Sequence, residues 1–89
     1  MKAYEAREAS IQAQFDIAMK EIEEAVYLGV NRACVCEGTL LYRETAEMLA
    51  NEGYDVKLTM EKKGEKTYVQ NMVSWRFAAK GREGRIEEP

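Results

Sequence analysis

A long amphipathic helix at the start of the chain limits what this sequence can fold into. Within residues 2 to 28, apolar residues recur at spacings of three and four: Ile11, Phe15, Met19, Ile22 and Val26. This spacing predicts one helix, about 40 Å long at ~1.5 Å per residue. A single domain of 89 residues has a radius of gyration of only about 12 Å. We therefore expect residues 2 to 9 either to protrude and fray, or to pack through Tyr4 and Ala6 on a second subunit.

The rest of the chain predicts three strands and a second, shorter helix. Residues 31 to 36 mix small and β-branched side chains, as in a short strand buried on both sides. Residues 40 to 52 place apolar side chains on one face of a helix, with Thr39 as its N-cap. Apolar and polar residues alternate over 55 to 61 and again over 67 to 78, and a glycine-containing hairpin loop joins these two strands.

The order of these elements defines the expected fold class. The order α-β-α-β-β predicts a single α+β domain over residues 1 to 79, with a three-stranded mixed sheet and two helices packed on one face. Gly29 and Gly53 are expected to end the two helices, each in a left-handed conformation, with the following residue folding back on the helix. Residues 80 to 89 are charged and interrupted by glycine, which predicts a flexible tail.

The last strand is expected to separate a core face from a mixed polar and aromatic face. The predicted core face carries Val69, Val73, Trp75 and Phe77. The opposite face, together with two side chains of the preceding strand, carries Lys57, Thr59, Tyr68, Gln70, Met72, Ser74 and Arg76. This second face is either exposed to solvent or an interface.

The composition argues against catalytic and metal chemistry. The chain has no histidine and two cysteines, Cys34 and Cys36, whereas a structural metal site usually needs four ligands and a catalytic cysteine needs a neighbouring base. Period-two geometry would place both thiols on one strand face, where we expect them to be reduced and buried; an intersubunit disulfide or a redox role is the alternative. We expect no enzyme activity, no cofactor and no metal.

Charge and hydropathy restrict the partners and the compartment. A net charge of −3 argues against nonspecific binding to nucleic acid or to an anionic membrane. No apolar run approaches the ~20 residues that span a bilayer, and the charged N-terminus is unlike a signal peptide. We therefore expect a cytoplasmic protein. Since no disulfide or metal site is available to stabilise so small a core, we also expect it to form homo-oligomers.

Aromatic residues beside arginines are the candidates for ligand binding. Tyr68 and Arg76 share the mixed face and could stack on a base and pair with a phosphate. Tyr42 and Arg43 form a similar pair at the start of the second helix, where the free N–H groups favour an anion. Arginines elsewhere in the chain would supplement these pairs or close over the ligand. The candidate set is Arg32, Tyr42, Arg43, Tyr68, Arg76, Arg82 and Arg85; the alternative is that these are ordinary surface residues.

Short patterns between residues 15 and 77 resemble a type of small tailed-phage protein. The patterns are Ala25-Val26-Tyr27-Leu28-Gly29, then Leu49-x-x-x-Gly53-Tyr54-x-Val56, and finally Val73-Ser74-Trp75. The resemblance implies an intracellular viral accessory protein. Some such proteins oligomerise and sequester cyclic nucleotide signals of host defence without cleaving them, and others are minor virion components. No binding residue is implied by the resemblance.

These observations support one leading hypothesis and two alternatives. The leading hypothesis is a non-catalytic, homo-oligomeric binding protein, a phage inhibitor of host defence that sequesters a small anionic ligand of nucleotide type. In it, the long first helix and the mixed sheet face supply the subunit contacts, and a pocket at the interface takes the anionic ligand or, alternatively, a protein loop. The second is a virion structural or assembly protein with only protein partners, a host protein among the possible ones. The third, an enzyme, lacks an acid–base pair in a concave site.

Overall fold

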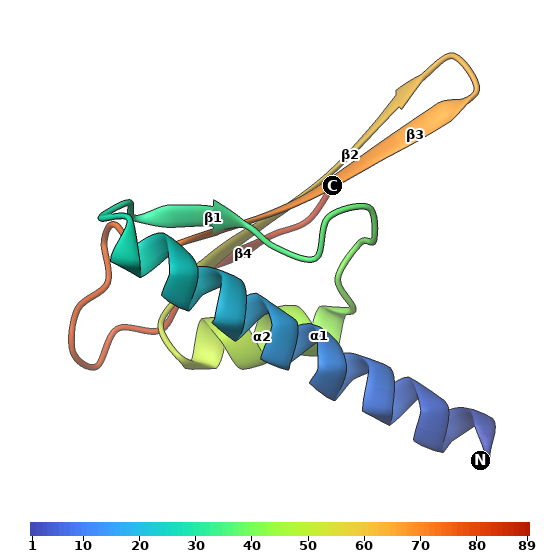
Figure 1. Ribbon diagram of the computed structural model, residues 1–89, viewed down its shortest axis with the longest axis horizontal. Coiled ribbons are helices and arrows are strands. Elements are labelled where there is room, and N and C mark those ends of the chain that lie inside the picture. Colours follow the sequence, from blue (N-terminus) through green and yellow to red (C-terminus); the bar gives the residue numbers. More distant parts are fainter.

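Two helices and four strands make up the computed structural model, which describes residues 1–89 (Figure 1). In chain order the elements are α1 (Ala3–Tyr27), β1 (Arg32–Cys34), α2 (Arg43–Asn51), β2 (Asp55–Lys63), β3 (Lys66–Ser74) and β4 (Ile86–Glu87). The long first helix and the hairpin of β2 and β3 are therefore confirmed. Neither helix is both long and apolar enough to cross a lipid bilayer.

The four strands form one mixed sheet in the order β1-β3-β2-β4. β3 is antiparallel to both β1 and β2, and β4 is parallel to β2. The two strands that flank α2, β1 and β2, thus run in the same direction, with β3 between them. The α+β class is confirmed. The expected three strands are one too few, because the segment we expected to be a flexible tail contributes β4.

Both helices lie on one side of the sheet and bury a single apolar core (Figure 1). Ala18 and Ile22 of α1 and Leu49 of α2 are at most 2% exposed. They pack with residues from the strands and the β1–α2 connection: Val35, Leu41, Val56, Leu58 and Val73. The opposite face of the sheet has no helix over it, and we call it the open face.

Each helix ends in the hydrogen-bond pattern that its glycine predicted. The N–H of Gly53 donates to Ala50, and the N–H of Tyr54 donates to Leu49 at 3.1 Å. Gly29 and Val30 make the equivalent pair of bonds at the end of α1. Both glycines have positive φ, which costs a residue without Cβ little.

The start of α2 differs from the prediction. The helix begins at Arg43 rather than at residue 40, and no side chain of its own N-cap residue satisfies the first turn. Side chains from distant elements bind the approaching backbone instead. Oδ1 of Asn71 accepts the N–H of Leu41 at 3.1 Å, and Oε1 of Gln14 accepts the N–H of Tyr42 at 3.1 Å. Because these partners are 30 and 28 residues away, local sequence could not indicate them.

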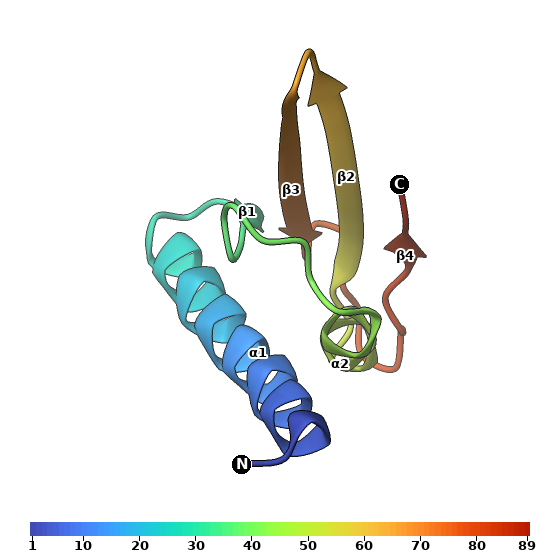
Figure 2. The ribbon, with the colours of Figure 1, turned by 90° about the vertical axis from the view of Figure 1, so that its right-hand side faces the viewer.

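The β2–β3 hairpin extends well beyond the layer that the helices cover (Figures 1 and 2). Met60 was expected on the buried face of β2 with Val56 and Leu58, but it is 51% exposed. Phe77 was expected on the core face of β3, but it is 65% exposed because the strand ends at Ser74 and the chain turns. Periodicity assigns a face correctly, yet a face is buried only where another element covers it.

Residues 78 to 87 fold back beside the start of β2 rather than extending as a tail. The N–H of Val56 donates to the carbonyl of Arg85 at 2.8 Å, and the N–H of Gly84 donates to Ala50 at 2.9 Å. Gly84 lies so close to Tyr54 that a Cβ on it would be 1.7 Å from the Tyr54 carbonyl oxygen. This return places Arg82 and Arg85 at the sheet.

Candidate functional site

A concavity of about 640 Å³ lies on the open face, where the end of β3 meets the returning C-terminal segment. Four of the predicted binding residues line it: Arg32, Arg76, Arg82 and Arg85. Lys57 adds a fifth cation, against two carboxylates, Asp55 and Glu87. We call this group of residues the cationic concavity. It is locally positive although the chain as a whole is negative.

Asp55 fixes the position of the C-terminal arginines. Nη2 of Arg82 lies 3.2 Å from Oδ1 and 3.3 Å from Oδ2 of Asp55. The backbone N–H of Arg85 donates to Oδ1 at 2.9 Å. The Arg85 hydrogen bond, assisted by the Arg82 guanidinium, lowers the pKa of the Asp55 carboxyl below its usual value of 3.8. Asp55 therefore stays ionised and occupies one side of Arg82.

Three guanidinium groups in the cationic concavity have no carboxylate partner. Arg82 forms an ion pair with Asp55, and Lys57 forms one with Glu87 at 3.9 Å. Arg32, Arg76 and Arg85 form no ion pair. Nη1 of Arg82 is buried and makes no hydrogen bond. A buried donor normally has a partner. The concavity thus offers several cationic donors to an anion, which is the arrangement that phosphate groups require.

An aromatic ring lies among these cations. The guanidinium carbon of Arg76 is 5.3 Å from the ring centroid of Phe77, and the ring is 65% exposed. An exposed ring beside a guanidinium can stack on a nucleobase while the cation pairs with a phosphate. Phe77 was not among the predicted ligand residues, because its place in the alternation indicated the core.

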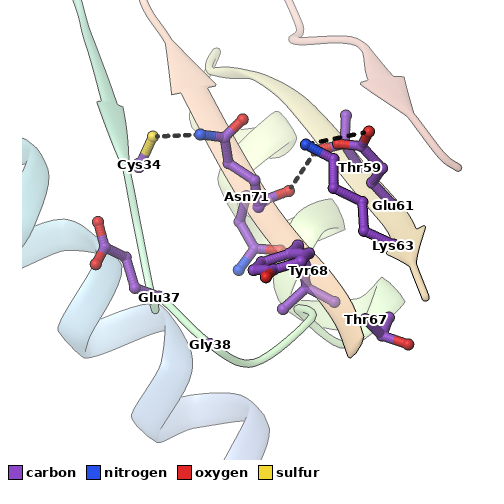
Figure 3. Close-up of a pocket in the computed structure, with 11 residues that line it drawn as sticks. Cys34, Glu37, Gly38, Thr59, Glu61, Lys63, Thr67, Tyr68 and Asn71 are labelled. Atoms are coloured by element: carbon purple, nitrogen blue, oxygen red, sulfur yellow. Dashed lines mark hydrogen bonds and ion pairs between the residues drawn. The ribbon is translucent and has the colours of Figure 1, made fainter. Parts of the chain in front are cut away.

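The structure does not bring Tyr68 to this site. Tyr68 and Ser74 are six residues apart on β3, roughly 20 Å at ~3.3 Å per residue, and Arg76 lies beyond Ser74. Tyr68 instead lines a second concavity of about 530 Å³ with Cys34 and Glu37 (Figure 3). The predicted pairing of Tyr68 with Arg76 on one ligand is therefore not formed within one chain.

Tyr42 and Arg43 lie at the start of α2, away from both concavities. The guanidinium of Arg7 stacks on the Tyr42 ring at 5.0 Å from its centroid. Arg43 forms ion pairs with Glu47 and Glu88. These internal contacts engage both side chains, so they do not join the other candidates.

The two cysteines lie in different environments rather than on one strand face. The Sγ of Cys34 accepts a hydrogen bond from Gln70 on the open face at 3.3 Å. β1 ends at Cys34, and Cys36 has a positive φ of 50° that turns its thiol towards the core, where it donates to the carbonyl of Gln14. Burial, reinforced by the Glu21 carboxylate, raises the pKa of the Cys36 thiol. No group of three or more histidine, cysteine or acidic side chains is arranged to hold a metal ion.

Comparisons with known proteins give no matching family model, no similar curated protein and no similar solved structure. Function is therefore argued from the geometry of the site.

Proposed function

We propose that this protein is a non-catalytic, homo-oligomeric binding protein that sequesters a small anionic ligand of nucleotide type in the cationic concavity. The observation that carries the proposal is the presence of three unpaired guanidinium groups, those of Arg32, Arg76 and Arg85, beside the exposed Phe77 ring. Sequestration needs affinity alone, and the concavity supplies charge, hydrogen-bond donors and a stacking surface without any acid–base pair.

The resemblance of the sequence to small tailed-phage proteins supports a biological setting for this activity. In that setting the protein acts in the cytoplasm of the host cell and lowers the free concentration of a nucleotide signal used in host defence. The proposal requires that the ligand be released chemically unchanged.

A thermal-shift series with mononucleotides and cyclic dinucleotides tests the proposal. A ligand at about 100 times its dissociation constant should add about 2.7 kcal/mol to the free energy of unfolding. The double variant Arg32→Ala/Arg76→Ala should weaken binding by about tenfold or more, since a hydrogen bond to a charged group contributes about 1.5–3 kcal/mol. Arg7→Ala is the matched control, because Arg7 lies on α1, lines no part of the concavity and should leave binding unchanged.

Two outcomes would contradict the proposal. The first is that no nucleotide shifts the unfolding transition. The second is that the ligand recovered after denaturing the protein has been hydrolysed, which would indicate an enzyme.

The alternative is a virion structural or assembly protein with only protein partners. The β2–β3 hairpin favours it, since this hairpin projects from the domain and carries the exposed Met60 and Tyr68 side chains. An absence of nucleotide binding together with self-association would support this alternative.

A further inference from the structure

The outer edge of β3 has backbone groups that no strand pairs. Lys63 faces Lys66 across the two-residue hairpin turn, so even-numbered residues of β3 exchange hydrogen bonds with β2. The backbone N–H and C=O groups of the odd-numbered residues therefore point away from β2. The bonds from the Val35 N–H to the Asn71 carbonyl and from the Trp75 N–H to the Asn31 carbonyl agree with this assignment.

β1 covers only one half of this edge. Its last residue, Cys34, pairs with Met72, and the chain then turns away towards α2. Thr67 and Val69 consequently have N–H and C=O groups that face outward, and neither residue makes a backbone hydrogen bond outside the β2–β3 ladder. An exposed strand edge of this kind is a template for another strand, and an isolated two-stranded hairpin is only marginally stable.

We propose that a second copy of this chain occupies this edge, with β3 of the two copies paired antiparallel about a two-fold axis at Tyr68. In this register Thr67 of each copy exchanges hydrogen bonds with Val69 of the other, so the same short segment supplies both sides. The two Tyr68 rings, each 53% exposed, become directly opposed on the open face, where cross-strand aromatic pairs are favourable. The register leaves neither copy with an outward-facing group of Thr67 or Val69 unpaired.

Charge supports the same arrangement. Lys66 of one copy is placed opposite Gln70 of the other, at the concavity that Tyr68 and Glu37 line (Figure 3). Neither Lys66 nor Glu37 forms an ion pair within its own chain. Glu61 and Lys63 also line this concavity of about 530 Å³, and they pair with each other at 3.7 Å. Glu37 is therefore left as the unpaired carboxylate there, and its charge is opposite to that of the partner's Lys66 in this register.

This dimer specifies the homo-oligomer of the proposed function but does not depend on the anionic ligand. The cationic concavity lies at the other end of β3, near Ser74. Loss of dimerisation and loss of ligand binding can therefore be measured separately.

Proline substitution at two cross-strand partners tests the proposal. Val69 faces Met60 in the register, and the N–H of each points outward, to opposite edges of the hairpin. Proline removes that N–H without removing a bond of the β2–β3 ladder. Val69→Pro should raise the dimer dissociation constant by at least about tenfold in analytical ultracentrifugation, whereas Met60→Pro should change it by less than about twofold. Circular dichroism checks that both variants fold.

A charge exchange gives a second measurement that does not alter the backbone. Glu37→Lys and Lys66→Glu should each weaken the dimer, and the double variant should restore it, because the exchanged pair again has opposite signs. A wild-type chain that remains monomeric at the highest concentration measured would overturn the proposal. Equal effects of the two proline variants, or no restoration in the double variant, would overturn it as well.

Discussion

Asn71 is a buried polar residue on which the connection between β1 and α2 depends. Its side chain is 1% exposed and lies on the helix-covered face of β3. Nδ2 donates to the carbonyl of Val35 at 3.0 Å and to that of Thr39 at 2.7 Å, while Oδ1 accepts the N–H of Leu41. One side chain thus satisfies backbone groups of an irregular segment that would otherwise be buried without partners.

Replacing Asn71 by leucine should therefore destabilise the fold more than its similar size suggests. The buried backbone groups of Val35 and Leu41 would lose their partner, and so would the partly buried carbonyl of Thr39, at a cost of about 3 kcal/mol. Urea denaturation followed by the fluorescence of Trp75 measures this loss. Asn51→Leu, at an exposed position of α2, should stay within about 0.5 kcal/mol of the wild type. Equal stability of the two variants would show that the segment does not need Asn71.

The returning C-terminal segment acts as an element of the sheet although only two of its residues form a strand. Gly84 allows it to approach, because no side chain separates it from the backbone of Tyr54. Val56 then receives a hydrogen-bond partner in Arg85, and β4 pairs with β2 through Val56 and Ile86. The approach of this element also brings Arg82 and Arg85 into the cationic concavity.

Gly84→Ala should displace this segment while leaving the core folded. A Cβ 1.7 Å from the Tyr54 carbonyl oxygen cannot be accommodated without movement of the backbone. The Val56 amide should then exchange with solvent deuterium faster than in the wild type, and nucleotide affinity should fall with the loss of Arg82 and Arg85. Glu83→Ala, at an exposed neighbouring position, is the control. Unchanged exchange at Val56 in Gly84→Ala would contradict the close contact.

Over the molecule as a whole, carboxylates outnumber cations, and the pKa values of two of them, Asp55 and Glu44, are lowered by arginine partners. The chain has 16 acidic residues against 13 basic ones. Asp55 is the carboxylate that joins the sheet to the C-terminal segment, and at 25% side-chain exposure it is only partly solvated. The fall in the free energy of unfolding at acid pH should therefore depend mainly on Asp55. The exposed Glu44, whose pKa is lowered by Arg7, should contribute a smaller part.

The sign of this dependence follows from the direction of the shift. The pKa of Asp55 is lower in the folded chain than its ordinary value of 3.8, so protonation favours the unfolded state. Its contribution is complete above about pH 4 to 5 and is lost as the pH falls through the lowered value. Asp55→Asn should reduce stability at neutral pH and flatten the fall below pH 4 in urea titrations. A variant whose stability falls at acid pH as that of the wild type does would exclude this role of Asp55.

Local patterns were enough to predict the elements that depend on near neighbours. The spacing of apolar residues predicted the length of α1, and the alternation of apolar and polar residues predicted the β2–β3 hairpin. Gly29 and Gly53 predicted the two helix ends. These features arise from contacts within a few residues of the chain. Four of the seven candidate ligand residues also proved to share one concavity, although nothing in the sequence placed Arg32 beside Arg85.

Features that depend on long-range contacts required the folded chain. The insertion of β3 between β1 and β2, the exposure of Phe77 and the start of α2 each follow from which distant element lies alongside. The separation of Tyr68 from Arg76 has the same origin, since alternation specifies a face but not a position along it. Side-chain periodicity is a property of the local backbone, whereas burial and proximity are properties of packing. The reason for a glycine at position 84 is therefore seen only in its contact with the backbone of Tyr54.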